Sequence, residues 1–161
     1  MTENRKFHTV RGYQLLEQNK RLLTPAMEDY LEMIYRNSLE EDYLRVNSLA
    51  ELLNVKASSA TKMVQKLARL ELVDYKKYGI IQLTESGKEI GSFLLHRHNV
   101  TETFLQFLGV QDRILVETEL IEHNISIDTL ELIDAFNQFI KENPEFAARF
   151  ELFKKQADKI P

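Results

Sequence analysis

The chain has 161 residues, a formal net charge of −4 and no cysteine. This length is enough for one domain, or for two small domains with a buried core. The lack of cysteine excludes disulfides, iron–sulfur clusters and thiolate zinc sites. No apolar run reaches transmembrane length, and the first residues lack the apolar stretch of a signal peptide. We therefore expect a soluble, cytoplasmic protein without a membrane partner.

Charge is distributed unevenly along the chain. Residues 44–84 carry seven Lys or Arg against three Asp or Glu, whereas residues 85–161 are strongly acidic. A basic segment followed by an acidic one is typical of a DNA-reading module attached to a module with another role.

The first 23 residues are polar, with scattered basic and apolar side chains. We expect a loosely packed arm there, although residues 12–23 have the composition of a short amphipathic helix. The first clear helix signal comes next: Thr24 as N-cap, Pro25 at the first helical position and Glu28 completing a capping box. This helix should run to about Asn37, before an acidic loop.

Residues 45–70 have the pattern of a helix-turn-helix. A short helix capped by Asn47 or Ser48 is broken at Asn54, and a second helix should run from Ala57 to Leu70. The outward face of the second helix carries hydroxyls, an amide and cations on Ser58, Ser59, Thr61, Lys62, Gln65, Lys66 and Arg69. Such groups bond phosphates and base edges in a DNA major groove.

The next segment predicts a β-hairpin. Leu72–Tyr75 and Ile80–Leu83 have strand composition, Lys76 and Lys77 lie at the tip, and Gly79 can adopt a positive φ. A basic hairpin directly after a helix-turn-helix predicts a winged helix, with the wing along the phosphate backbone. The alternative interpretation of residues 45–70, a small pair of helices with a hydrated surface, does not explain the β-hairpin that follows.

The rest of the chain predicts helices. A long helix is expected over about Ser86–Leu108, ended by Gly109, and a shorter one over Gln111–Asn124. Ser126 should cap a third helix, and Pro144 should begin the last. Their apolar faces exceed what one small domain buries, which favours a dimer interface.

Two stretches outside the DNA-binding pattern carry candidate metal ligands. Glu119, Glu122 and His123 fall on one helix face at 3.6 residues per turn, and two carboxylates with an imidazole form half of a hard-to-borderline metal site. Asp29 and Glu32 lie three residues apart on the helix that begins at Pro25. For the first stretch, the alternative is a solvated helix face that ends in a histidine.

Several short motifs occur in order between residues 24 and 141. They are Thr24-Pro25-Ala26-Met27-Glu28-Asp29-Tyr30, Ser58-Ser59-Ala60-Thr61-Lys62-Met63-Val64-Gln65-Lys66-Leu67, Leu83-Thr84-Glu85-Ser86-Gly87-Lys88, Arg97-His98 and Ile121-Glu122-His123. Together they resemble the diphtheria-toxin-repressor family, and most closely its manganese transport regulator branch. The resemblance implies a dimeric, metal-activated repressor of metal-uptake genes.

The resemblance also implies a two-metal site. Its ligands are an Asp and a Glu of the first helix, a His of the long helix and a Glu-x-x-Glu-His set, and they fall on Asp29, Glu32, His98, Glu119, Glu122 and His123. The implied cofactor is Mn²⁺, two per subunit, with Fe²⁺, Co²⁺ or Zn²⁺ as alternatives.

We therefore expect a mainly α chain with an N-terminal extension over residues 1–23, a winged helix-turn-helix DNA-binding domain over residues 24–84, and a helical metal-binding and dimerisation domain over residues 85–161. The expected function is manganese-dependent regulation of transcription through palindromic, double-stranded operator DNA bound by a homodimer. The expected DNA-binding residues are Ser58, Ser59, Thr61, Lys62, Gln65, Lys66, Lys76 and Lys77.

Two alternatives come from other classes. One is a winged-helix regulator that responds to iron or to an organic ligand, with the acidic cluster merely solvated. The other is a two-metal hydrolase, since carboxylates and histidines also build such sites. Nothing nucleophilic or glycine-rich accompanies the cluster, so we do not expect an enzyme.

Overall fold

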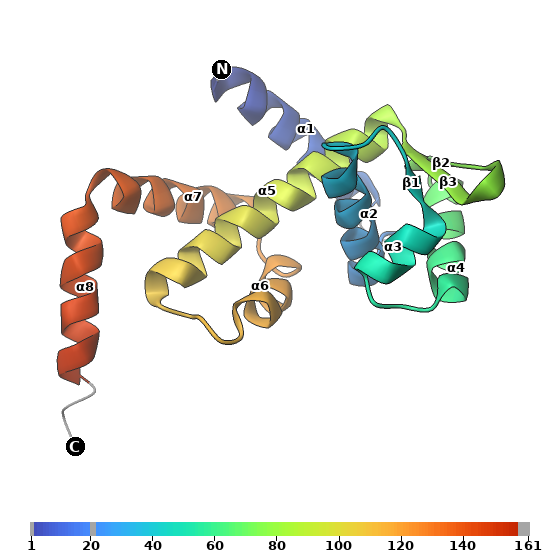
Figure 1. Ribbon diagram of the computed structural model, residues 1–161. Helices are drawn as coiled ribbons and strands as arrows, with labels where there is room; N and C mark the ends of the chain where they lie inside the picture. The colour runs from blue at the N-terminus through green and yellow to red at the C-terminus, as the bar shows by residue number, and fades with distance from the viewer. Residues whose placement is uncertain (1, 20–21, 158–161) are drawn as a thin grey trace. The chain divides into compact units, whose positions relative to one another are not determined.

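The computed structural model describes residues 2–19 and 22–157 (Figure 1). The elements are α1 (Thr2–Asn19), α2 (Pro25–Ser38), β1 (Leu44–Arg45), α3 (Val46–Leu52), α4 (Ala57–Arg69), β2 (Val73–Lys76), the 3₁₀ turn η1 (Lys77–Gly79), β3 (Ile80–Leu83), α5 (Glu85–Leu108), α6 (Ile114–Glu122), α7 (Ile127–Glu142) and α8 (Pro144–Ala157). The expected class, a mainly α chain with a winged helix and further helices, is confirmed. The chain divides into two compact units whose boundary, between His96 and Arg97, lies inside α5. Among the described helices, none is long and apolar enough to cross a membrane.

Helix α2 begins where the capping residues predict. The Thr24 hydroxyl oxygen accepts a hydrogen bond from the Met27 N–H at 3.3 Å, and Pro25 occupies the first turn, where an N–H would have no helical partner. Leu31 and Ile34 on its apolar face are 0% and 2% exposed. This face packs against α3, α4 and β3 and forms the core of the first unit.

Helices α3 and α4 form the predicted helix-turn-helix. Ala60, Val64 and Leu67 of α4, spaced four and three residues apart, are each 0% exposed and line the core side of the helix. Asn54 adopts a positive φ of 52° in the turn between the helices. The opposite side of α4 is therefore left to solvent.

The predicted cap of α3 is wrong. The helix begins at Val46, before both Asn47 and Ser48, and its N-cap Arg45 makes no side-chain capping bond. Arg45 is also the last residue of β1 and pairs with Ile80. The strand pairing, and not a polar side chain, therefore fixes where α3 starts.

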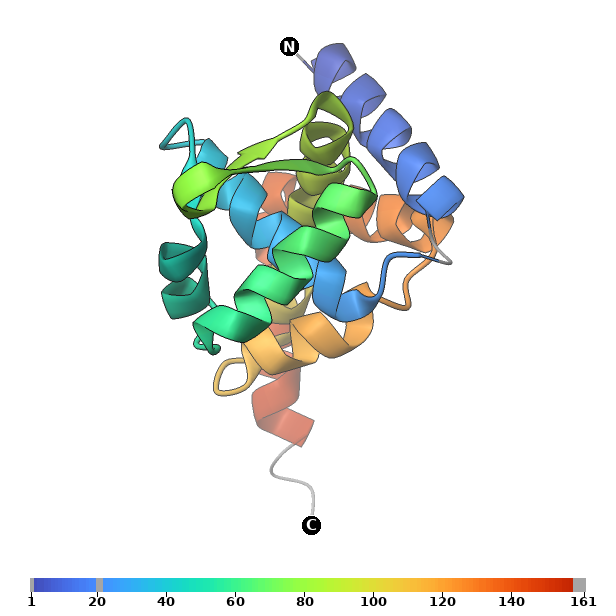
Figure 2. The ribbon, with the colours of Figure 1, turned by 90° about the vertical axis from the view of Figure 1, so that its right-hand side faces the viewer.

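The predicted hairpin is confirmed, and β1 adds a third, unpredicted strand in the order β1-β3-β2. All pairs are antiparallel, with Lys76 opposite Ile80 next to the tip. Figure 2 shows the hairpin beside α4, against which β2 packs. Tyr78 and Gly79 have φ values of 64° and 74°. At Gly79 a Cβ would also lie 2.9 Å from Val46 Cγ1, so both space and backbone favour glycine.

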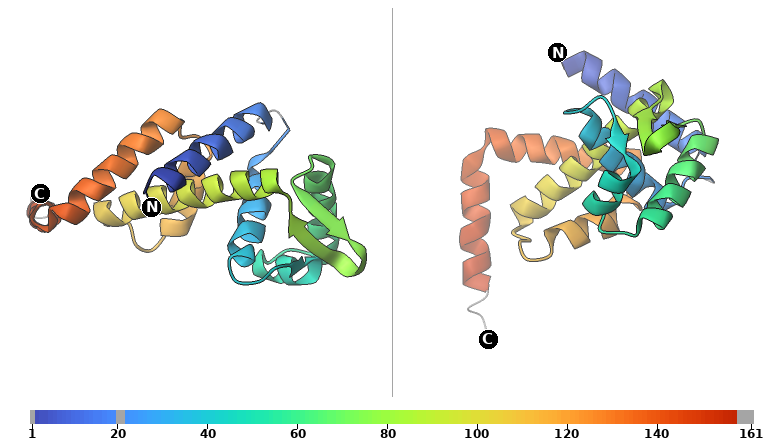
Figure 3. Two further views of the ribbon diagram at one scale, coloured as in Figure 1. Left: turned by 90° about the horizontal axis from the view of Figure 1, so that it is seen from above. Right: turned by 45° about the vertical axis from the view of Figure 1, so that its right-hand side comes forward.

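Helix α1 starts earlier than the predicted amphipathic stretch and packs against the first part of α5 (Figure 3). The Arg11 Nε donates to Glu89 Oε2 at 3.0 Å. Gly12 is buried, and a Cβ there would overlap the Glu89 carbonyl oxygen and lie 2.8 Å from the Phe93 Cβ. The expectation of a loosely packed arm is therefore wrong for this part of the extension; residues 20–21 lie outside the described residues.

The second unit contains the later part of α5 with α6, α7 and α8. Gly109, with a φ of 92°, ends α5 as predicted, and the Ser126 hydroxyl caps α7 by accepting from the Thr129 N–H at 3.3 Å. Asn137 of α7 is 2% exposed and donates to the Val100 carbonyl at 2.9 Å. This hydrogen bond joins α7 to α5.

Helix α8 leaves α7 at a sharp corner (Figure 3). The Lys154 ammonium donates to the Leu108 carbonyl at 3.1 Å and so connects α8 to the end of α5. Large apolar side chains remain exposed on α7 and α8: Leu132, Phe136, Phe139, Phe146, Phe150, Leu152 and Phe153. An apolar surface of this kind is typical of a protein–protein interface.

Candidate functional site

The exposed side of α4 carries the groups that sequence reasoning selected for DNA. Ser58, Ser59, Lys62, Gln65 and Lys66 are exposed. Thr61 is half-buried. These side chains lie opposite the buried face of the helix, so the packing that holds α4 in place also directs them to solvent.

The wing adds a second exposed basic region in the same unit. Lys76 and Lys77 are both exposed, and Tyr78 at the tip is 85% exposed. The Lys76 ammonium donates to the Gln82 side chain across the hairpin. Lys77 follows in the tip itself, so the wing presents cationic and aromatic groups suited to a phosphate backbone.

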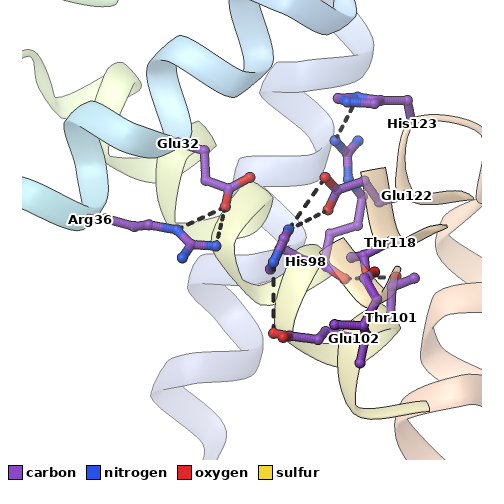
Figure 4. Close-up of polar contacts among 10 residues, drawn as sticks. Glu32, Arg36, His98, Thr101, Glu102, Thr118, Glu122 and His123 are labelled. Atoms are coloured by element: carbon purple, nitrogen blue, oxygen red, sulfur yellow. Dashed lines mark hydrogen bonds and ion pairs between the residues drawn. The ribbon is translucent and has the colours of Figure 1, made fainter. Parts of the chain in front are cut away.

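Asp29 and Glu32 lie on α2, in the first unit. Asp29 is half-buried, and Glu32 is 7% exposed. Arg36, one turn later, donates to Glu32 Oε1 from Nε at 2.9 Å and from Nη2 at 2.6 Å (Figure 4). Burial raises the pKa of the Tyr30 hydroxyl, which lies on the same helix, above its ordinary value.

The second unit brings His98, Glu122 and His123 together. Ligand atoms of His98 and Glu122 lie within 4.8 Å of one another, and so do those of Glu122 and His123. Glu122 is 1% exposed, with Oε2 3.2 Å from His98 Nδ1 (Figure 4). Within the described residues this oxygen has no partner in hydrogen-bond geometry. A buried carboxylate needs a compensating cation or donors, so Glu122 fits a cation-binding role.

Glu119 is exposed, and the groups of possible ligands found among the described residues do not include it. Two residues that sequence reasoning did not select lie in the cluster. Glu102 Oε2 is 3.7 Å from His98 Nε2, and Arg97 Nη2 is 3.2 Å from His123 Nδ1. The i, i+4 spacing of Glu102 from His98 was a usable signal. Arg97 stands in the Arg97-His98 motif, but the sequence does not indicate its contact with His123.

The donor set indicates the kind of ion that it suits. Carboxylate oxygens and imidazole nitrogens are present, and the chain has no cysteine. Such ligands suit hard and borderline divalent cations such as Mn²⁺, Fe²⁺ and Zn²⁺ rather than soft ions. The side chains present therefore fit a divalent metal.

Fold and side chains together define a winged-helix DNA-binding protein with a helical second unit that carries a carboxylate–imidazole cluster. The sequence pattern of the iron dependent repressor N-terminal DNA binding domain matches residues 22–81. The pattern of the iron dependent repressor metal binding and dimerisation domain matches residues 84–150. The chain belongs to the iron-dependent repressor family, which confirms the resemblance seen in the motifs.

Individual relatives support the same family assignment. The HTH-type transcriptional regulator MntR of Bacillus pumilus (strain SAFR-032) is 41% identical over 136 residues, which is 84% of this chain and 94% of that protein. MntR of Bacillus subtilis (strain 168) is 43% identical over 123 residues, or 76% of this chain and 87% of that protein.

Solved structures are also similar. The manganese regulator SloR has a TM-score of 0.64 at 34% identity, covering 73% of this chain and 55% of that one. A manganese-dependent transcriptional repressor in complex with manganese has a TM-score of 0.59 at 35% identity, covering 70% and 52%. The chain thus spans about half the length of these two solved proteins.

Proposed function

We propose that this protein is a metal-dependent transcriptional regulator that binds operator DNA as a homodimer and represses metal-uptake genes when Mn²⁺ is available. The proposal is carried by two features that occur together in this chain. One is the exposed basic side of α4, and the other is the cluster of possible metal ligands around the buried carboxylate of Glu122. DNA binding would place the protein with the chromosome in the cytoplasm.

DNA would be read by α4 and steadied by the wing. Lys62 and Gln65 occupy the centre of the exposed side of α4, where a helix in a major groove meets base edges. Ser58, Ser59, Thr61 and Lys66 would bond the flanking phosphates and sugars, and Lys76 and Lys77 the backbone beside the groove. Phosphate contacts supply affinity, and base contacts supply sequence preference.

The proposed metal ligands are Asp29, Glu32, His98, Glu119, Glu122 and His123. Mn²⁺ is proposed because relatives are named as manganese regulators and because the ligands are oxygen and imidazole. Two ions per subunit would use six protein ligands; Fe²⁺, Co²⁺ and Zn²⁺ are competing ions for the same set.

Metal control follows from how these ligands are divided along the chain. Asp29 and Glu32 belong to the unit that reads DNA, and the other four ligands belong to the unit that begins at Arg97. Without positive charge, four carboxylates brought together would repel one another. A bound divalent cation supplies charge that offsets this repulsion, so ligation by both sets would couple the units. Coupling energies in allosteric proteins are about 1–3 kcal/mol.

A homodimer is proposed from the exposed apolar side chains of α7 and α8, of which Leu132 and Phe153 are 72% and 65% exposed. A second copy would cover them. A two-fold dimer would bind a palindromic operator, with its recognition helices about 34 Å apart, or one turn of DNA.

The rival functions are less well supported. Regulation by an organic ligand leaves the buried, partly unsatisfied Glu122 without an explanation. Hydrolysis leaves the exposed side of α4 and the basic wing without a role.

Fluorescence anisotropy of a labelled operator tests the proposal. Protein is titrated in Mn²⁺, Fe²⁺, Co²⁺, Zn²⁺ or EDTA, with Fe²⁺ handled anaerobically. Mn²⁺ should raise the affinity about 5- to 150-fold, the range of usual coupling energies. Equal affinity in EDTA and in saturating Mn²⁺ would show that metal does not control DNA binding.

A further inference from the structure

Arg97 is a buried cation beside His123, one of the proposed ligands. It is 4% exposed and directly precedes His98 on α5. Its Nη2 lies 3.2 Å from Nδ1 of His123, the contact marked by the dashed line at His123 in Figure 4. The contact lies entirely within the second unit, because both residues belong to it.

The chemistry of the two groups fixes the direction of this hydrogen bond. A guanidinium only donates, and a neutral imidazole has one acceptor nitrogen and one N–H. Nδ1 of His123 must therefore be the acceptor, and in the neutral ring Nε2 carries the proton. The one lone pair that His123 has available is already bonded to Arg97.

A metal ion needs that same lone pair. If the ion binds through Nδ1, it must replace the guanidinium. If it binds through Nε2, that nitrogen must lose its proton; a neutral ring then carries the proton on Nδ1, where it faces a second donor. For a neutral ring, therefore, ligation by His123 breaks the bond to Arg97 by either route.

We propose that Arg97 is a built-in competitor that occupies His123 in the metal-free protein and sets the metal concentration at which the regulator responds. The inference rests on the proposed metal site. Residues that support metal-bound histidines usually accept a hydrogen bond from the ring N–H and strengthen metal binding. Arg97 donates to the ring, so its removal should strengthen metal binding instead.

Arg97→Met tests the proposal, because it keeps a long side chain of similar reach and removes every donor. Mn²⁺ affinity, measured by the electron paramagnetic resonance signal of free Mn²⁺, should rise about tenfold to a hundredfold, as expected when a hydrogen bond to a charged group no longer competes. The matched control is Arg113→Met, which removes the same charge from an exposed side chain of the same unit. It should change affinity less than about twofold, since exposed charges are screened by salt.

The double variant Arg97→Met/His123→Ala links the effect to His123. In the His123→Ala background, Arg97→Met should no longer raise the affinity. Unchanged or weaker Mn²⁺ binding by Arg97→Met, with wild-type helix content by circular dichroism, would overturn the proposal. If neither the wild-type protein nor any variant binds Mn²⁺, the proposed metal site fails and this inference fails with it.

A measurement on the wild-type protein decides the matter if Arg97→Met does not fold. Side-chain NMR should show Arg97 guanidinium protons protected from exchange in the metal-free protein. Zn²⁺, which is diamagnetic, should abolish that protection as the His123 nitrogens shift on ligation. Protection that persists while His123 is ligated would show that Arg97 does not compete with metal.

Discussion

Gln65→Ala should change which operators are preferred, whereas Lys77→Ala should weaken binding to all operators alike. Gln65 is exposed on α4, and Lys77 is exposed in the wing tip. Neither contributes to the core, so each substitution should change the free energy of unfolding by less than about 0.5 kcal/mol. Any larger change in DNA affinity therefore reports on the interface.

The two variants should differ in size and kind of effect. Removing the proposed base-reading amide of Gln65 should cost about 1–3 kcal/mol at one base pair of each half-site. Removing the proposed phosphate-binding ammonium of Lys77 should lower the salt slope by about 0.9 per subunit, or about 1.8 for a dimer. A fourfold rise in salt should then weaken DNA binding by Lys77→Ala about tenfold less than DNA binding by the parent.

The assay is anisotropy with a set of operators that differ at one symmetric base pair, each titrated at several salt concentrations in saturating Mn²⁺. Gln65→Ala should reorder the set and keep the parent's salt slope. Lys77→Ala should keep the order and lower the slope. Equal weakening on every operator for Gln65→Ala would refute base recognition by this residue.

Three further substitutions test other parts of the structure. Gly12→Val should destabilise the protein by about 1–3 kcal/mol in urea unfolding, because its side chain would overlap the backbone of Glu89; exposed Gln14→Ala on the same helix is the control, and equal effects would argue against close packing of α1. Thr24→Ala removes the N-cap of α2 and should cost about 1 kcal/mol, measured by thermal denaturation; an unchanged melting temperature would argue against the cap. Asp29→Met replaces a hard carboxylate with a thioether and should let Fe²⁺ or Co²⁺ activate DNA binding about as well as Mn²⁺; a retained preference for Mn²⁺ would place selectivity in other ligands.

Features encoded by neighbouring residues could be predicted from sequence. Thr24 with Pro25 marks a helix start, and Gly109 marks a helix end, because the cap needs only residues close in the chain. The alternation of buried and exposed positions on α4 also follows from helix geometry alone. These local signals were sufficient for the helix-turn-helix and the wing.

Features that depend on distant partners could not be predicted. The two residues of β1 are too few for a periodic pattern and exist because they pair with β3. Helix α3 starts after Arg45 because the pairing of Arg45 with Ile80 fixes the end of β1, and no side-chain capping bond is made there. Arg97 belongs to the Arg97-His98 motif, but only the fold brings its guanidinium to His123. Helical spacing indicated five of the candidate ligands and the motif resemblance added His98, whereas their burial, and the exposure of Glu119, required the structure.

Metal control of DNA binding is tested most directly by measuring Mn²⁺ affinity with and without operator DNA. Linkage requires that the factors by which DNA tightens the binding of each Mn²⁺ ion, multiplied together over all the ions of one dimer, equal the factor by which saturating Mn²⁺ tightens DNA binding. Matching factors of about 5- to 150-fold in the wild-type protein, abolished in Glu122→Ala, are the expected result. Identical Mn²⁺ affinity in the free and DNA-bound protein would contradict metal control.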